Sequence, residues 1–388
     1  MTDHDGTPGT QTLADLDAVA MASGFRSGDF TPVEALEAVL ARVDSRERVV
    51  KALWFLDEGA ARAGAARSAE RWRRGESLGP LDGVPLTLKE NIATKGASMP
   101  LGSAATELVP APEDAPPAAR LREAGTILIG KTTMPDLGML SSGLSSFHAL
   151  TTNPWNPAWN PGGSSSGAGA AAAAGYGPLH MGTDIGGSLR LPAAWNAVVT
   201  LKPSAGRVPI DPPYFGRAAG PLTRTVRDAA LLMSVVSAPD ARDYMCLPPA
   251  DIDWMDLSRF EPRGLRVALL PKAGCGLPVD PETSAAIGAA ALLFGQDGAY
   301  VEEIPPFLTQ EMLDDLDLFW RVRARLDCRR MSPERYARLL PFIRDWIEGL
   351  PARLSGSLSA DAETLMRCVN RILEVKKTTQ RATEGFDL

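Results

Sequence analysis

The sequence has 388 residues, of which 45% are hydrophobic and 22% charged, and a formal net charge of −7 at pH 7. This composition is ordinary for a globular protein, and the length allows either two or three domains or one large α/β fold. The negative charge repels phosphate backbones, and no apolar run reaches the roughly 20 residues that span a bilayer, so we expect no direct contact with nucleic acid or membrane.

The N-terminal part predicts a tail followed by helices. Residues 1–11 are polar and lack the apolar core of a signal peptide, so we expect a flexible tail over residues 1–12 and a cytoplasmic protein. Two helices are expected over residues 13–43. The second begins at Thr31-Pro32-Val33-Glu34, a capping box with proline at the first helical position. Its apolar stripe consists of Leu36, Val39, Leu40 and Val43.

Residues 81–89 predict a turn and then a strand. Asp82-Gly83 supplies the turn, and the strand alternates apolar residues with Pro85, Thr87 and Lys89. We therefore expect Lys89 at the end of a strand, on the face opposite the apolar side chains. Taken alone, Lys89 is better explained as an exposed surface lysine. A short helix over residues 118–124 and a strand over 126–129 follow.

Two turns rich in glycine and serine come next. Residues 140–167 are rich in Ser, Asn, Pro and Gly, which indicates a loop. Residues 168–174 have high helix propensity, so the run from Gly162 to Gly167 is expected just ahead of a helix. The second turn is expected over residues 182–188. The glycines of both turns allow backbone N–H groups to approach a ligand closely.

The C-terminal third predicts an α/β unit and further helices. Strands are expected over residues 265–270 and 300–304, with a helix from Asp280-Pro281 to Gly298 between them. This order is typical of a βαβ unit with a parallel strand pair. Helices are expected over residues 321–349 and 360–382.

The positions of the histidines argue against a Ser-His-Asp triad. Residues 163–167 match the G-x-S-x-G pattern of the nucleophile elbow, which would make Ser165 the nucleophile. That site needs a histidine late in the chain as base. The histidines are His4, His148 and His180, and none follows position 180.

Other common sites also fail to match. The glycine–serine run that ends at Gly167 continues with Ala168 and not into GK[ST], as a phosphate loop requires, and no serine lies three residues before a lysine. No His, Cys or carboxylate cluster has metal-ligand spacing, and the first turn lacks the GxGxxG pattern of dinucleotide sites. We expect neither a metal nor an organic cofactor. The widely spaced cysteines predict free thiols: Cys246, Cys275, Cys328 and Cys368. What remains is a serine activated by a lysine, which acts as a base only if burial lowers its pKa from about 10.4.

Eight segments occur in an order that is typical of one family. They are GVPLTLKEN (83–91), GKTTMP (130–135), NPW (153–155), PGGSSSG (161–167), GTDIGGSLR (182–190), LKPS (201–204), GRVP (206–209) and GPLTRTVRD (220–228). This order resembles the amidase signature family, most densely over residues 79–228.

The resemblance implies an α/β fold with a large central mixed β-sheet flanked by helices. It implies a single domain over residues 13–388 with its catalytic core at about 79–228. Family members run on past a segment similar to Phe386-Asp387-Leu388, so we expect the C-terminal part to be truncated.

The resemblance also assigns catalytic roles. Ser188 is expected to be the nucleophile, Lys89 the base, and Ser164 the bridging serine held by a cis peptide bond after Gly163. The oxyanion hole is expected to consist of the backbone N–H groups of Ile185, Gly186, Gly187 and Ser188.

Four further residues have supporting roles by the same resemblance. Asp184 and Arg190 are expected to support the second turn, Ser165 to support the proton relay by hydrogen bonding, and Met139 to line the acyl pocket.

The function that follows is hydrolysis of a small-molecule carboxylic amide through an acyl-enzyme on Ser188. Esters and carbamates are further candidate substrates, and a homo-oligomer stays open. One alternative is the glutaminase (A) subunit of a tRNA-dependent amidotransferase. We rank it second because residues 212–220 lack the stretch usual in those subunits. The other alternative is an inactive truncated fragment with a binding role only.

Overall fold

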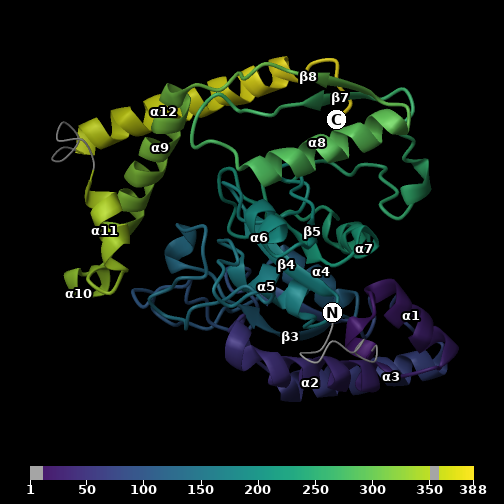
Figure 1. Cartoon of the computed structure of the whole chain (residues 1–388). Helices are drawn as coiled ribbons and strands as arrows, with labels where there is room; N and C mark the ends of the chain where they lie inside the picture. Colours follow the sequence, from purple (N-terminus) through teal and green to yellow (C-terminus); the bar gives the residue numbers. More distant parts are fainter. Residues whose placement is uncertain (1–11, 350–357) are drawn as a thin grey trace. The chain divides into compact units, whose positions relative to one another are not determined.

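The computed structural model describes residues 12–349 and 358–388, which form two compact units. Unit 1 contains residues up to 256 together with 338–340, and unit 2 contains residues 257–337 and 341–388. Each unit has its own β-sheet (Figure 1). The tail expected over residues 1–12 lies outside the described residues except for Thr12, and the single domain expected over 13–388 stays a prediction.

Unit 1 is built on a six-stranded sheet with the strand order β1-β3-β2-β4-β6-β5. Its strands are β1 (Leu53–Leu56), β2 (Pro85–Lys89), β3 (Ile127–Thr132), β4 (Leu179–Asp184), β5 (Val199–Thr200) and β6 (Ala218–Thr223). β2 runs parallel to both β3 and β4, whereas β1, β6 and β5 are antiparallel to their neighbours. The sheet is therefore mixed, as the resemblance implied.

Helices flank this sheet. They are η1 (Leu13–Asp15), α1 (Ala18–Ser27), α2 (Pro32–Val50), α3 (Glu58–Arg74), α4 (Pro116–Glu123), η2 (Asp136–Gly138), α5 (Ser166–Ala174), α6 (Arg190–Trp195) and α7 (Val226–Val236). The predicted capping box of α2 is confirmed: Glu34 N donates to Thr31 Oγ1 at 3.2 Å, and Thr31 N donates to Glu34 Oε2 at 2.7 Å. All four residues of its predicted apolar stripe are buried.

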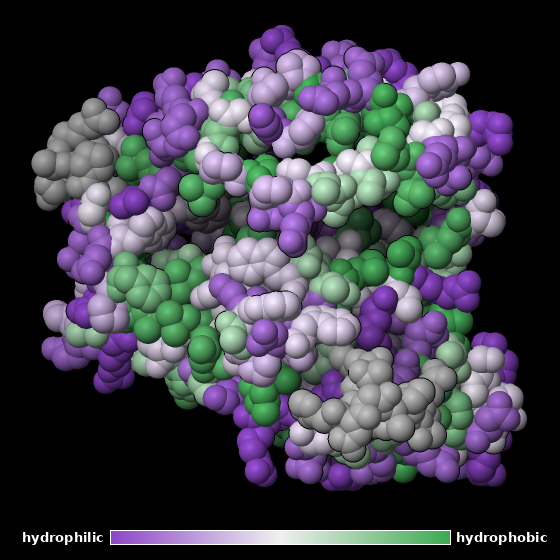
Figure 2. All heavy atoms as spheres, viewed as in Figure 1, coloured by the Kyte–Doolittle hydropathy of each residue, from purple (hydrophilic) through white to green (hydrophobic). Residues whose placement is uncertain are grey.

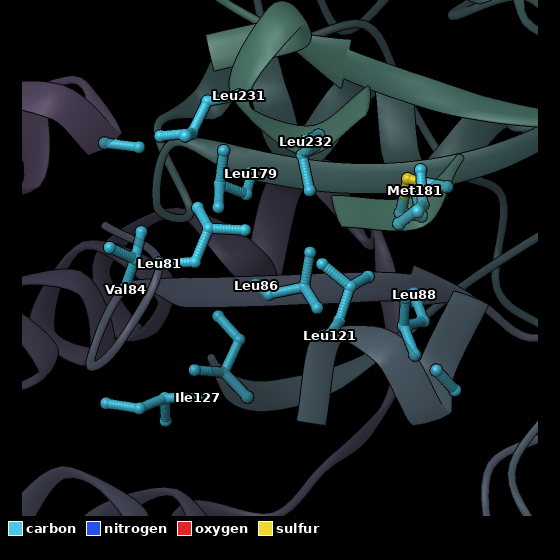
Figure 3. Close-up of a cluster of buried hydrophobic side chains, with 14 of the residues drawn as sticks. Leu81, Val84, Leu86, Leu88, Leu121, Ile127, Leu179, Met181, Leu231 and Leu232 are labelled. Carbon is cyan, nitrogen blue, oxygen red and sulfur yellow. The ribbon is translucent and has the colours of Figure 1, made fainter. Parts of the chain in front are cut away.

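The main core lies against one face of the sheet. Figure 3 shows Leu86 and Leu88 of β2 beside Leu121 of α4 and Leu232 of α7, all almost fully buried. Because side chains alternate along a strand, Thr87 and Lys89 point to the other face. Both are fully buried there, and α5, buried along its whole length, packs on β2 and β4. The predicted placement of Lys89 at a strand end is confirmed, but not as a surface residue.

Several strands were not expected from the sequence. The second turn was expected to begin at Gly182, but residues 182–184 belong to β4, and β3 continues to Thr132. The sequence of β4 is Leu-His-Met-Gly-Thr-Asp. It has low strand propensity, because strands are usually rich in β-branched and aromatic residues. Its place between β2 and β6 is set by tertiary packing, since all six of its residues are buried.

Unit 2 contains the predicted βαβ unit and a group of helices. Its elements are η3 (Leu257–Arg259), β7 (Arg266–Leu269), α8 (Pro281–Gln296), β8 (Tyr300–Glu303), α9 (Gln310–Cys328), α10 (Pro333–Tyr336), α11 (Pro341–Glu348) and α12 (Leu358–Ala382). β7 and β8 are parallel, which confirms that prediction. The helix expected over residues 321–349 is instead the end of α9 followed by α10 and α11.

Hydrophobic residues also reach the surface, where they lie among hydrophilic ones on the face that Figure 2 draws. In α8 no residue is buried, and Leu292 and Leu293 are 69% and 61% exposed. The cysteines are free thiols, as predicted. Among the helices described, none combines the length and apolar character needed to cross a lipid bilayer.

Candidate active site

The site forms where the carboxyl ends of the parallel strands β2 and β4 lie side by side. Lys89 ends β2, and residues 183–184 end β4. The Nζ atom of Lys89 lies 2.8 Å from Ser164 Oγ, 3.1 Å from Ser165 Oγ and 3.2 Å from Thr183 Oγ1. Lys89 thus meets three hydroxyl groups, which come from both of the glycine-rich segments predicted from the sequence.

Lys89 meets the physical condition for a lysine base. Its side chain has no exposed surface. Burial, together with the positive charge of Arg217, lowers the pKa of Lys89 to about 7, although Glu90 and Asp184 act in the opposite direction. A substantial fraction of Lys89 is therefore a neutral amine near pH 7, able to accept a proton.

Ser164 lies in the geometry that the resemblance implied. The Gly163–Ser164 peptide bond is cis, and Ser164 is 5% exposed. The chain packs closely here, since a Cβ atom on Gly163 would lie 2.5 Å from the carbonyl oxygen of Leu140. The Ser164 hydroxyl is the nearest hydrogen-bond partner of the Lys89 amine.

Ser165 joins the two turns. Its hydroxyl donates to the carbonyl oxygen of Thr183 at 3.0 Å and accepts from Thr183 N at 3.2 Å, while Ser165 N donates to the carbonyl oxygen of Ser188 at 3.1 Å. Gly182 makes room for it, because a Cβ atom there would lie 2.7 Å from Ser165 Oγ. Ser165 therefore fixes the distance between the turns that carry Ser164 and Ser188.

Ser188 is half-buried at the end of the second turn. Within residues 12–349 and 358–388, no hydrogen bond joins the Ser188 hydroxyl to Ser164 or Lys89. The structure brings Ser188 into the site through its backbone, which accepts the hydrogen bond from Ser165.

The backbone N–H groups of the second turn differ in their partners. Gly187, with a φ of 114° that suits glycine alone, donates its N–H to Asp184 Oδ1 at 2.9 Å. The N–H groups of Ile185, Gly186 and Ser188 have no acceptor in the part of the chain that the structure describes. Three of the four expected oxyanion donors are therefore available to a ligand, and the fourth is engaged.

Asp184 lies at the centre of this turn. Besides Gly187 N, its carboxylate accepts from Leu189 N at 3.0 Å and from the Arg190 guanidinium at 2.9 and 3.1 Å. Burial alone would raise the pKa of Asp184, but the hydrogen bonds from Arg190 and from the turn outweigh it and lower the pKa. A charged Asp184 thus holds the backbone of the turn in place.

Three residues of this site were not singled out from the sequence. Thr183 contacts Lys89 directly, and Asn91 Nδ2 donates to Thr183 Oγ1 at 3.0 Å. Asn91 lies in the turn directly after β2, where Ile92 N donates to the carbonyl oxygen of Lys89 at 2.9 Å, so the alternation of a strand does not indicate its side. Glu90, with no exposed side-chain surface, pairs with His148 Nε2 at 3.0 Å. Only the fold brings His148 to it, from a loop far along the chain.

Met139 lies half-buried directly after η2. Its neighbour Gly138 is close to the site, because a Cβ atom on Gly138 would lie 3.4 Å from Ser164 Oγ. Met139 is therefore near the candidate site, at a place compatible with a pocket wall. Across the described ranges, no three His, Cys, Asp or Glu side chains gather as metal ligands would.

Comparison with known proteins places this site in a family. A family model described as Amidase matches residues 34–357. The (A) subunit of the glutamyl-tRNA(Gln) amidotransferase of Chloroflexus aggregans is 36% identical over 329 residues, which are 83% of this chain and 66% of that protein. An acylamidase of Rhodococcus erythropolis is 37% identical over 300 residues, 76% of this chain and 63% of that protein.

A solved structure gives the same result. The structure of a bacterial aryl acylamidase, described as an amidase signature enzyme, matches with a TM-score of 0.77 and 28% identity, over 92% of this chain and 78% of that one. The chain spans slightly less than two thirds of the length of the two curated relatives. The matched family model covers most of the chain, and the site motifs lie within it, so this chain belongs to the amidase signature family.

Proposed function

We propose that this chain hydrolyses carboxylic amides through an acyl-enzyme on Ser188, with Lys89 as the base and Ser164 as the proton relay. One observation carries the proposal: a fully buried lysine with a lowered pKa lies 2.8 Å from the Ser164 hydroxyl. Burial without a hydrogen-bonded acidic partner favours the neutral form of an amine, and the Ser164 hydroxyl beside it can supply the proton that a neutral amine accepts.

The proposed reaction begins with the proton relay. Neutral Lys89 takes the proton of Ser164, Ser164 takes the proton of Ser188, and Ser188 Oγ attacks the carbonyl carbon of the substrate. The attack requires the Ser188 side chain to turn toward Ser164. Ser164 then passes a proton to the leaving amine, and water hydrolyses the acyl-enzyme by the reverse path.

The oxyanion is stabilised by backbone N–H groups of the second turn. Ile185, Gly186 and Ser188 have free N–H groups there, among the residues described, whereas Gly187 would have to leave Asp184 in order to contribute. A donor of this kind typically contributes about 3–4 kcal/mol to transition-state stabilisation. In this proposal Ser165, Asp184 and Arg190 hold the two turns together, and Met139 lines the pocket of the acyl group.

The substrate assay is a panel of aryl amides, esters and carbamates on the purified chain. We expect Ser188→Ala to abolish hydrolysis and labelling by a fluorophosphonate. Ser166→Ala is the matched control, because this buried serine lies in the first turn without contacting Lys89. Hydrolysis retained in Ser188→Ala contradicts the proposed nucleophile, and a wild-type chain that is neither labelled nor active supports the binding-only alternative.

A second candidate function is that of a glutaminase subunit. It is favoured by the 36% identity to the (A) subunit of the amidotransferase of Chloroflexus aggregans. Ammonia release from glutamine without hydrolysis of aryl amides would support this candidate. Hydrolysis of aryl amides without ammonia release from glutamine would contradict it.

A further inference from the structure

The side-chain amide of Asn91 has a single hydrogen-bond partner. Its Nδ2 donates to Thr183 Oγ1 at 3.0 Å, while its Oδ1 is buried and has no partner within residues 12–349 and 358–388. A side-chain amide keeps its shape when it turns by 180°, which exchanges the oxygen and the nitrogen. The orientation of the Asn91 amide is therefore decided by Thr183.

The hydrogens at Lys89 can be counted. A neutral amine has two N–H donors and one lone pair. Ser165 already donates its own proton to the carbonyl oxygen of Thr183, so toward Lys89 it can only accept. One N–H and the lone pair remain for Ser164 and Thr183.

The remaining N–H group and the lone pair of Lys89 can be assigned to Ser164 and Thr183 in two ways, and only one of them supports the proton relay. The lone pair must face Ser164, since Lys89 takes the proton of that hydroxyl, and the second N–H must then point to Thr183. The Thr183 hydroxyl, in turn, needs another acceptor for its own proton. In the described part of the chain, Thr183 Oγ1 has hydrogen bonds with Lys89 and Asn91 alone. The Asn91 oxygen can accept that proton, and the Asn91 nitrogen cannot.

The charged form of Lys89 leads to the same requirement. An ammonium group donates to all three hydroxyls and accepts from none, so the Thr183 proton again needs the Asn91 oxygen. With the nitrogen toward Thr183, the Thr183 hydroxyl donates to neutral Lys89 and occupies the lone pair that Ser164 needs. The two orientations of Asn91 thus correspond to a productive and an unproductive amine.

We propose that Asn91 is a positioning residue whose side-chain amide, turned by 180° from the orientation described above, accepts the Thr183 hydroxyl with its oxygen and so keeps the lone pair of Lys89 directed at Ser164. The inference rests on the proposed function of Lys89 as base and adds the residue that orients it. Asn91 acts through Thr183 and does not itself contact the reacting groups.

The test uses two variants. Asn91→Leu removes the acceptor oxygen and keeps a side chain of similar size, whereas Asn91→Asp keeps an acceptor oxygen. We expect Asn91→Leu to lower kcat by roughly tenfold with little change in KM, the equivalent of about one buried hydrogen bond. Asn91→Asp should regain kcat at high pH, with its pH profile displaced upward because a negative charge favours the ammonium form. Equal loss in both variants at every pH overturns the inference.

Thr183→Val tests whether the effect passes through Thr183. In that background Asn91→Leu should cause no further loss, whereas independent effects would multiply. Thr132→Val is the matched control: Thr132 is the register partner of Lys89 on β3, and its buried hydroxyl has no hydrogen-bond partner among the described residues. This control should leave kcat unchanged. Multiplying effects of Asn91→Leu and Thr183→Val contradict the inference.

NMR titration of Lys89 in protein with ¹³C-labelled lysine separates this inference from the proposed function, since it needs no activity. Asn91→Leu should lower the pKa of Lys89, because Thr183 then donates to the neutral amine, and the shift should vanish in Thr183→Val. The charged groups near Lys89, Arg217, Glu90 and Asp184, are unchanged in these variants. A pKa that does not move in Asn91→Leu overturns the inference even if wild type proves inactive.

Discussion

Two lysines on neighbouring strands have the same burial and different surroundings. Lys89 ends β2, and Lys131 lies beside it on β3, paired with Leu88. Lys89 has no exposed surface and Lys131 has 1%, and burial lowers the pKa of each to about 7. Burial alone therefore does not distinguish a base from a structural lysine.

The hydrogen-bond partners of the two lysines do distinguish them. The Lys131 amine donates to the carbonyl oxygen of Ile92 and to Thr94 Oγ1, and Thr94 donates its own proton to the same carbonyl at 3.2 Å. Both partners of Lys131 only accept, so its lone pair meets no proton. Lys89 instead faces Ser164, whose hydroxyl can donate back. Lys131 thus holds the chain that follows Lys89, whereas Lys89 has the hydroxyl contact that the proposed base requires.

The largest expected difference is in activity. Lys89→Met should lower kcat for an aryl amide by roughly 10²–10⁴-fold, the range of general acid–base catalysis. Lys131→Met should retain kcat within about tenfold, since general-base catalysis does not pass through it. Both are measured at a temperature where circular dichroism shows each variant folded. A greater loss in Lys131→Met than in Lys89→Met would reverse the assignment of the two lysines.

The pH dependence of kcat/KM should report Lys89. The base must be neutral, and the lowered pKa of about 7 means that the neutral fraction stops growing above that pH. We therefore expect kcat/KM to rise about tenfold per pH unit below 7 and to level off above it. Lys131→Met should keep this profile. A rate that still rises tenfold per unit between pH 8 and 10 would mean that Lys89 has its ordinary pKa.

The two lysines also differ in how much of their role could be predicted from the sequence. Alternation of apolar and polar residues placed Lys89 at a strand end, and the glycine–serine segments located Ser164 and Ser188. The same reasoning gave Lys131 no role beyond its place in the GKTTMP segment. Its partners Ile92 and Thr94 come from another segment, which only the folded sheet brings near.

The rest of the site depends on tertiary structure for a physical reason. The strand β4 ends with Gly182, Thr183 and Asp184, and glycine and aspartate are depleted in strands, so propensity indicated a turn. The engagement of Gly187 N–H by Asp184 likewise follows from backbone angles within the turn. No pattern of residue types distinguishes a free N–H group from a bonded one.

Stability should depend on pH through both lysines. Their pKa is about 7 in the folded chain and about 10.4 when unfolded, so between these values the unfolded chain binds more protons. The free energy of unfolding should therefore rise from pH 7 to 10, by about 1.4 kcal/mol per pH unit for each lysine. Urea denaturation at pH 7, 8 and 9 should give Lys131→Met a shallower rise than wild type. Parallel curves would show that Lys131 is protonated throughout.

The smallest expected effect comes from removing one hydroxyl group that is hydrogen-bonded to each lysine amine. Thr94→Val takes a partner from Lys131 and should lower the free energy of unfolding by about 1 kcal/mol, the usual contribution of a hydrogen bond, with kcat unchanged. Ser165→Ala takes a partner from Lys89 and also loosens the link between the two turns, so it should lower kcat. If Thr94→Val lowers kcat as much as Ser165→Ala does, the two amines are coupled through residues 89–94, and Lys131 belongs to the catalytic machinery.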